Sequence, residues 1–159
     1  MTTPRELLKA EAIEAMQGQW KTHDLNDNAV RSAKFLGAAT GLVNLGFELM
    51  TVMPGREASE YHRHLYEEEC YYILGGSGEV EIDGVSHAVG AGDFLGFPAN
   101  GLAHVLRNTG DAPLTFLAAR HMLVQDVCDY PKKGLRLYMN GPQEAFVKFS
   151  EVIGLKTPP

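Results

Sequence analysis

The chain has 159 residues, of which 45% are hydrophobic and 21% charged, values typical of one soluble globular domain. A formal net charge of −6 offers no basic face for phosphate backbones, so we expect no nucleic-acid partner. Cys70 and Cys128 are too few for a secreted disulfide framework. Because no apolar run approaches membrane-spanning length and the first residues do not resemble a signal peptide, we expect a cytoplasmic protein with no membrane partner.

The N-terminal residues predict a short helix followed by an arm. Thr3, Pro4 and Glu6 form a capping-box pattern, and Gly18 is expected to end the helix. Residues 19–40 have weak periodicity, so we expect an arm that crosses the body of the protein, with Trp20 as its anchor. Residues 1–40 are therefore assigned to an N-terminal helix and arm.

The central residues predict a barrel of short strands, assigned to residues 41–125. From about residue 41 hydrophobic residues recur at every second position as far as Pro54, which indicates a half-buried strand. Asp83-Gly84 joins two further runs and is typical of a two-residue hairpin turn. Seven more strands are expected, over 60–64, 69–74, 79–82, 85–89, 93–97, 103–108 and 114–121. Eight strands at this spacing favour a closed barrel or jelly roll over an α/β fold.

Residues 126–159 are assigned to a C-terminal extension that contains a helix. Pro142 fits the first turn of that helix and Gly154 its end. An apolar stripe runs between them, made of Ala145, Phe146, Phe149, Val152 and Ile153. The predicted fold class is thus all-β, a jelly-roll barrel with short N- and C-terminal helices in one structural domain.

Histidine and glutamate residues in the barrel indicate a metal site. His62 and His64 are two apart on a predicted strand and share one face, the acidic run 67–69 follows, and His104 lies on a later strand. Neutral imidazoles with a carboxylate suit a divalent transition metal (Zn, Fe, Mn, Ni or Co) and exclude a pure calcium or magnesium cage.

Two motifs carry a resemblance to the cupin superfamily. Gly55-(six)-His62-Arg63-His64-(four)-Glu69-(six)-Gly76 resembles its first conserved motif, and Gly92-(five)-Pro98-Ala99-Asn100-Gly101-(two)-His104-(three)-Asn108 its second. Each differs from the usual form by one extra residue in a turn, where insertions are tolerated. The whole chain most resembles small single-domain bacterial cupins of unassigned activity. This resemblance implies a cupin barrel with four metal ligands, His62, His64, Glu69 and His104, and a homodimer.

The carboxylate ligand has two candidates. The family's glutamate stands six residues before a hairpin glycine; counting from Gly76 selects Glu69, and counting from Gly75 selects Glu68. We prefer Glu69, because it shares its strand face with Tyr71, a side chain that could line a pocket. Tyr66, Tyr71 and Asn108 are the candidates for orienting the ligands or binding a substrate.

The function expected from this site is the binding or conversion of a small polar organic molecule. An enzyme such as a sugar-phosphate isomerase or a dioxygenase, a non-catalytic ligand-binding protein and a purely structural metal site are the alternatives. Phosphosugar chemistry requires cations in the pocket, but Arg63 and Arg107 alternate with metal-facing residues and should point away. Arg31 and Arg56 could reach the pocket only from loops. His23, His87 and His121 lie outside the motifs and are expected to be exposed or locally hydrogen-bonded.

Overall fold

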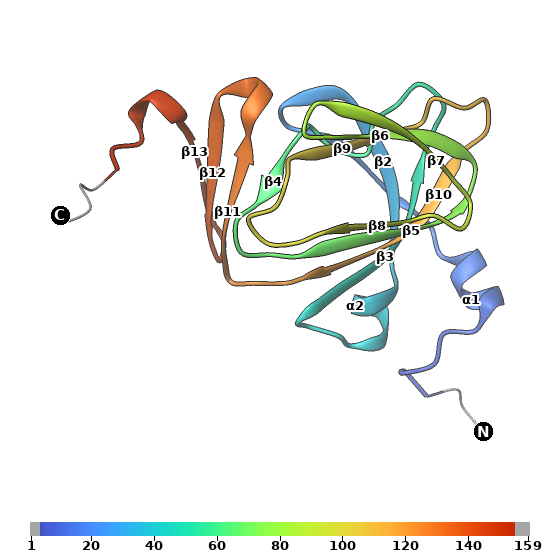
Figure 1. Ribbon diagram of the computed structural model, residues 1–159. Coiled ribbons are helices and arrows are strands. Elements are labelled where there is room, and N and C mark those ends of the chain that lie inside the picture. The colour runs from blue at the N-terminus through green and yellow to red at the C-terminus, as the bar shows by residue number, and fades with distance from the viewer. Residues whose placement is uncertain (1–3, 155–159) are drawn as a thin grey trace.

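The computed structural model describes residues 4–154 as three antiparallel β-sheets that enclose a common interior (Figure 1). The six-stranded sheet has the order β1 (Gln19–His23), β2 (Asn26–Phe35), β3 (Leu45–Val52), β10 (Leu114–His121), β5 (Glu69–Gly75), β8 (Phe94–Phe97). The three-stranded sheet has the order β7 (Val85–Gly90), β6 (Ser77–Ile82), β9 (His104–Arg107). The four-stranded sheet has the order β13 (Gln143–Lys148), β12 (Leu135–Asn140), β11 (Gln125–Tyr130), β4 (Arg63–His64). The all-β barrel predicted from the sequence is confirmed.

The period-two pattern of the sequence determines which side chains fill the barrel. On β10, Leu114 and Phe116 are buried, whereas the alternate residues Thr115 and Leu117 face the other side of the sheet and are partly exposed. The main core cluster combines inward side chains of the six-stranded and three-stranded sheets, including Ile73 of β5 and Leu106 of β9. The polar site adjoins this core, since the rings of Phe97 and Tyr71 in the cluster pack against that of His104.

The Asp83-Gly84 hairpin is confirmed in its backbone geometry. Asp83 has φ 50° and Gly84 has φ 78°, as a type I′ turn requires at both central positions. This turn joins β6 to β7, with Ile82 opposite Val85.

The N-terminal part differs from its prediction. Helix α1 spans only Ala10–Ala15, and Thr3, the expected cap, lies outside the described residues. Residues 19–35, expected as an arm, form the hairpin β1–β2, which adds to the barrel sheet because β2 pairs with β3. A short helix α2 (Leu36–Thr40) connects β2 to β3. Trp20 is 60% exposed and so does not anchor this segment in the core.

The predicted C-terminal helix is wrong. Gln143–Lys148 forms the strand β13, paired in antiparallel register with β12, and Gly141 takes a positive φ of 60° in the turn between them. Only two 3-10 turns occur in this region, Pro131–Lys133 and Phe149–Glu151. An apolar run this short suits a strand as well as a helix, and pairing with β12 decides between them. Strands β11–β13 stand at the end of the barrel opposite α1 (Figure 1).

No helix among residues 4–154 is both long and apolar enough to cross a membrane.

Candidate metal centre and ligand cavity

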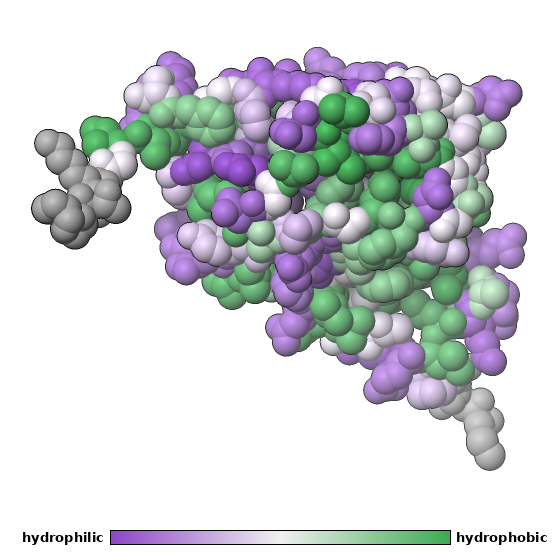
Figure 2. Space-filling model, in the orientation of Figure 1, coloured by the Kyte–Doolittle hydropathy of each residue, from purple (hydrophilic) through white to green (hydrophobic). Residues whose placement is uncertain are grey.

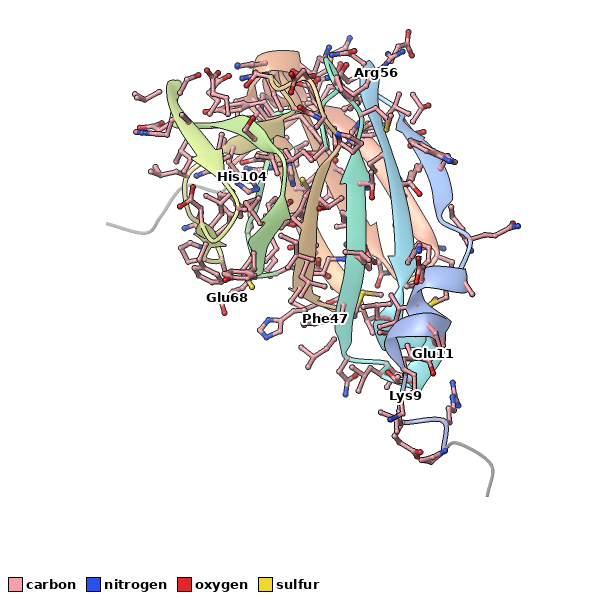
Figure 3. The ribbon with its side chains drawn as sticks, turned by 90° about the vertical axis from the view of Figure 1, so that its right-hand side faces the viewer. Lys9, Glu11, Phe47, Arg56, Glu68 and His104 are labelled. Atoms are coloured by element: carbon pink, nitrogen blue, oxygen red, sulfur yellow. The ribbon has the colours of Figure 1, made fainter. Side chains whose placement is uncertain are left out.

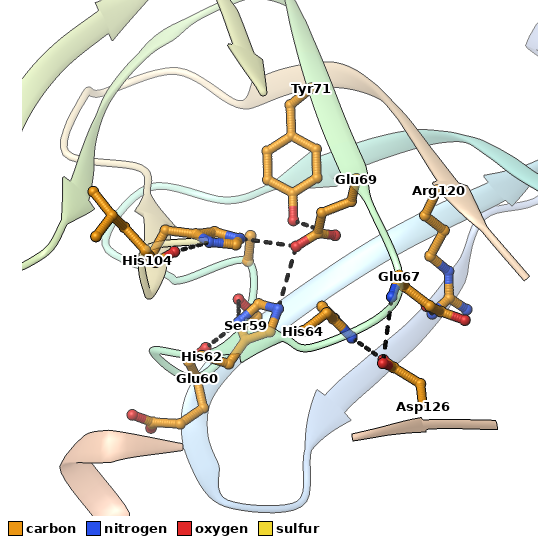
Figure 4. Close-up of polar contacts among 12 residues, drawn as sticks. Ser59, Glu60, His62, His64, Glu67, Glu69, Tyr71, His104, Arg120 and Asp126 are labelled. Atoms are coloured by element: carbon orange, nitrogen blue, oxygen red, sulfur yellow. Dashed lines mark hydrogen bonds and ion pairs between the residues drawn. The ribbon is translucent and has the colours of Figure 1, made fainter. Parts of the chain in front are cut away.

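Three of the predicted ligands meet inside the barrel. Nε2 of His104 lies 2.8 Å from Oε1 of Glu69, and Nε2 of His62 lies 3.3 Å from the same oxygen (Figure 4). His62 and His104 come from adjacent segments that exchange backbone hydrogen bonds, and Glu69 begins β5 on the facing sheet. These side chains are 10% exposed or less, so two nitrogens and one oxygen converge at a site shielded from water.

The opposite nitrogens of these two imidazoles face acceptors. Nδ1 of His62 lies 2.7 Å from the Glu60 carbonyl oxygen, and Nδ1 of His104 lies 3.3 Å from the Leu102 carbonyl oxygen. A neutral imidazole carries one N–H, which these carbonyls accept at Nδ1. Each Nε2 lone pair then points at the Glu69 carboxylate, an arrangement that a cation between them would satisfy. This donor set fits a divalent transition metal ion.

His64 borders this group and is turned toward a second one. Its ring centroid lies 5.1 Å from that of His62, and its Nδ1 lies 2.5 Å from Oδ2 of Asp126. Burial favours the neutral ring of His64, but the hydrogen bond to Asp126 and the nearby carboxylates raise its pKa. In the neutral ring the proton lies on Nδ1 beside Asp126, and Nε2 is free to bind a cation. His64, Glu67 and Asp126 form a second group of side chains close enough to share an ion. Asp126 in that group also accepts hydrogen bonds from the backbone N–H groups of Tyr66 and Glu67.

Electrostatics keep the central group in the protonation state that metal ligands need. Burial opposes a charge on Glu69, but His104 and His62, whose Nε2 atoms face its Oε1, hold its pKa well below the usual range. Burial also lowers the pKa of His62, which favours the neutral imidazole. The Tyr71 hydroxyl donates to Oε2 of Glu69 at 3.0 Å, and burial together with this carboxylate raises the pKa of Tyr71. A neutral imidazole beside a carboxylate is ready to bind a cation without first losing a proton.

A cavity of about 540 Å³ opens beside this group, a size typical of small-molecule sites. His62, His64, Glu69 and Tyr71 line one part of it. The β1–β2 hairpin and strands β11–β13 supply much of the rest, including His23, Arg31 and Tyr130. The two segments whose structure the sequence did not predict therefore build the cavity wall.

The other predicted site residues lie elsewhere. The Tyr66 side chain is 60% exposed and does not line the cavity. The Asn108 amide donates to the Val52 and Ala112 carbonyl oxygens and fixes the backbone there. Glu68 is exposed at the outer edge of the barrel, away from His104 (Figure 3), so the structure brings Glu69 to the histidines and not Glu68.

Three cavity or site residues were missed by the sequence analysis. Asp126 carries no sequence signal, because it meets His64 only through the pairing of β11 with β4. His23 is locally hydrogen-bonded, one of its two expected states, since Leu25 N–H donates to its Nδ1 at 3.2 Å, but its place in the cavity lining was not expected. Arg31 was expected to reach the pocket only from a loop, but it lies on β2 and lines the cavity.

Two arginines point away from the cavity as expected. Arg63 pairs with Asp129, and Arg107 pairs with Glu57 and Glu81.

Comparison with known proteins identifies the family. Residues 48–120 match the family model for the cupin domain. A crystal structure of a candidate sugar phosphate isomerase from Acidithiobacillus ferrooxidans is 40% identical, with a TM-score of 0.95 over 96% of this chain and 98% of that one. A sugar phosphate isomerase from a cupin superfamily of Silicibacter pomeroyi is 27% identical, with a TM-score of 0.79 over 91% of this chain and 94% of that one. With these matches, the chain belongs to the cupin superfamily, and its structural neighbours are of unassigned or provisional activity.

Curated relatives match a smaller part of this chain than these crystal structures do. An oxalate-binding protein from Thermotoga maritima is 39% identical over 72 residues, which are 45% of this chain and 58% of that protein. The chain spans about half the length of the curated relatives it matches.

Proposed function

We propose that this protein binds a small polar organic molecule at a divalent transition metal ion held by His62, His64, Glu69 and His104. One observation carries the proposal: Nε2 of His62 and Nε2 of His104 both face a single Glu69 oxygen, while each Nδ1 faces a carbonyl oxygen. A metal ion satisfies all three atoms at once, which two neutral imidazoles and a carboxylate cannot do among themselves.

The adjoining cavity supports a ligand-binding role over a purely structural one. Four protein ligands leave one or two positions open on a five- or six-coordinate ion. His62, His64 and Glu69 line the cavity, so the open positions would face it. A bound metal supplies Lewis-acid polarisation of a ligand oxygen. The protein side chains orient that ligand, and Tyr71 holds the second oxygen of Glu69.

Proton-transfer chemistry, such as aldose–ketose isomerisation, is a second candidate, favoured by His23. Burial, with the nearby His62 and Arg31, lowers the pKa of His23 to about 4. Leu25 N–H donates to its Nδ1, so the neutral ring carries its proton on Nε2. A neutral imidazole in the cavity wall could exchange a proton with a ligand. The names of the structures at 40% and 27% identity agree with this class of reaction.

Metal analysis tests the first proposal. The protein is stripped with chelator, reloaded separately with Zn(II), Mn(II), Fe(II), Co(II) and Ni(II), and its metal content and melting temperature are measured. We expect about one ion per chain and a higher melting temperature for at least one metal. Failure of all five metals to bind would overturn the metal proposal.

The loaded protein is then assayed for interconversion of aldose and ketose phosphates and, with Fe(II), for oxygen consumption. Turnover in the first assay would establish the isomerase candidate.

We also propose that the chain forms a homodimer. The outer face of the six-stranded sheet carries a row of apolar side chains in cross-strand register, Leu49, Leu117, Tyr72 and Phe94. Tyr72 and Phe94 are 46% and 65% exposed. Hydrophobic residues also reach the surface on the face seen in Figure 2. Apolar area gathered on one sheet face is typical of a protein–protein interface.

The free thiols of Cys70 and Cys128 support the proposal of a cytoplasmic location, where cysteines stay reduced.

A further inference from the structure

Two cations face the cavity from neighbouring strands. Lys21 on β1 lies directly opposite Arg31 on β2, and both line the cavity. Side chains opposite each other in an antiparallel pair point to the same side, with Cβ atoms about 4.5–5.5 Å apart. Like charges in this arrangement destabilise a sheet unless an anion lies near them.

Neither cation has a carboxylate partner among the described residues. The ion pairs of residues 4–154 use other basic side chains, namely Arg63, Arg107, Arg120, Lys132, Lys133, Arg136 and Lys148, and imidazoles of the site. Asp24, Glu48 and Glu144 also line the cavity, but none of them pairs with Arg31 or Lys21. The cavity therefore contains a half-buried guanidinium that forms no ion pair with a carboxylate of residues 4–154.

A backbone contact holds the guanidinium of Arg31 near the metal ligands. Its Nη1 donates to the Ala58 carbonyl oxygen at 2.7 Å. The next residue, Ser59, has its Oγ 3.3 Å from Nδ1 of His62. A guanidinium has five N–H donors, and this one contact leaves the others available to a ligand. Planar donors fixed in this way suit the paired oxygens of a carboxylate or phosphate.

We propose that Arg31, with Lys21 beside it, binds the anionic group of the cavity's ligand, which is therefore an organic carboxylate or a phosphate ester and not a neutral polyol. This inference rests on the proposed function in taking the cavity as the ligand site. It corrects the expectation that Arg31 could reach the pocket only from a loop. A metal ion held by the site would bind one ligand oxygen, and Arg31 in the cavity wall would bind the anionic group.

Calorimetric titration of the full chain, with and without metal, tests the inference. Each anion is paired with a neutral analogue of similar shape: malonate with malonamide, and glucose 6-phosphate with glucose. The variant Arg31→Gln removes the charge, Arg31→Lys keeps it without the planar fork, and Arg56→Gln is the control. Arg56 is exposed, bonds to Asn28 and does not line the cavity. Arg56→Gln therefore changes the net charge as much as Arg31→Gln does, but outside the cavity.

We expect at least one anion to bind wild-type protein about tenfold or more tightly than its neutral analogue. Arg31→Gln should lower the affinity for that anion about 10- to 100-fold, the range for losing hydrogen bonds to a charged group. We expect an intermediate affinity for Arg31→Lys and the wild-type affinity for Arg56→Gln. Whether malonate or glucose 6-phosphate binds identifies the anion as carboxylate or phosphate. Any of three results would overturn the inference: the neutral analogues bind as tightly as the anions, Arg31→Gln binds the anion within twofold of wild type, or neither anion binds.

Metal content keeps this test separate from that of the proposed function. Arg31→Gln should retain the metal content and melting temperature of wild type, because Arg31 contacts no proposed ligand. Anion binding that depends on Arg31 in protein unable to hold metal would support the inference while refuting the metal proposal. Full metal loading without any anion binding would refute the inference while supporting the metal proposal.

Discussion

Oδ2 of Asp126 lies 2.5 Å from Nδ1 of His64, although the two residues are 62 positions apart in the chain. Asp126 is 2% exposed, and its other oxygen accepts the backbone N–H groups of Tyr66 and Glu67. These bonds fix the carboxylate, which in turn fixes the ring of His64 and directs the proton to Nδ1. Asp126 is thus a positioning residue for a proposed metal ligand, supplied by β11 from outside the two sequence motifs.

Replacing Asp126 should weaken metal binding without removing a proposed ligand. In Asp126→Asn the amide offers one acceptor where the carboxylate offers two, so the His64 ring or the 66–67 backbone loses its partner. We expect metal affinity to fall about 10- to 100-fold, the usual effect of losing a residue that orients a metal-binding histidine. Competition with a chromogenic chelator measures it. Asp111→Asn, at an exposed position, is the control. Equal affinities in Asp126→Asn and wild type would remove the positioning role.

Glu69 and Glu68 should respond differently to the same substitution. Glu69→Gln replaces the oxygen shared by His62 and His104 with a neutral amide, so bound metal should fall by about tenfold or more. Glu68→Gln alters an exposed side chain and should leave metal content unchanged. Elemental analysis of both purified proteins gives the comparison. Metal loss in the Glu68 variant with retention in the Glu69 variant would reverse the assignment.

Asp129 should stabilise the fold in a pH-dependent way. Burial disfavours its charge, but hydrogen bonds from Arg136 and Arg63 lower its pKa below the usual value. A carboxyl group with a lowered folded pKa stabilises the protein above its unfolded pKa of about 3.9, and this contribution is lost as the pH falls through the folded pKa. We expect Asp129→Asn to lower the free energy of unfolding by about 1–3 kcal/mol at pH 7.

That difference should shrink as the pH falls below about 4, because the carboxyl group of the unfolded chain is then protonated, and it should vanish below the lowered folded pKa, where the native group is protonated too. Urea unfolding at several pH values measures it, with Asp27→Asn, at an exposed position, as the control. A difference that stays constant from pH 7 to pH 3 would show that the charge of Asp129 does not stabilise the fold.

The proposed dimer should depend on the apolar row of the six-stranded sheet. Tyr72 lies between Leu117 and Phe94 in that row, so Tyr72→Lys would put a charge at the centre of the interface. We expect wild-type protein to scatter light as a dimer at micromolar concentration and the variant as a monomer. Val85→Lys, at an exposed apolar position on β7, should remain dimeric. A wild-type monomer would refute the homodimer.

Local patterns in the sequence determined the strands of the barrel and the identity of the central polar residues. Alternation along β5 placed Glu69, Tyr71 and Ile73 on one face, since successive strand residues point to opposite faces. On β3 the pattern indicated a strand but not its inner face, because Met50 and Val52 are buried while Leu45 and Phe47 are exposed. The Asp83-Gly84 turn followed from the positive φ that both positions require. The convergence of His62, Glu69 and His104 followed from the resemblance of the two motifs that contain them to the cupin superfamily.

Only the tertiary structure decided what surrounds that group. The Gln143–Lys148 segment became a strand because β12 offers it a pairing edge, although its apolar spacing suggested a helix. Arg31 and His23 reached the cavity because β2 pairs with β3 and carries β1 along. Asp126 met His64 because β11 pairs with β4. Hydrogen bonds between distant strands leave no periodic trace in the sequence, so the wall of the cavity, and with it the choice of ligand, depends on long-range pairing.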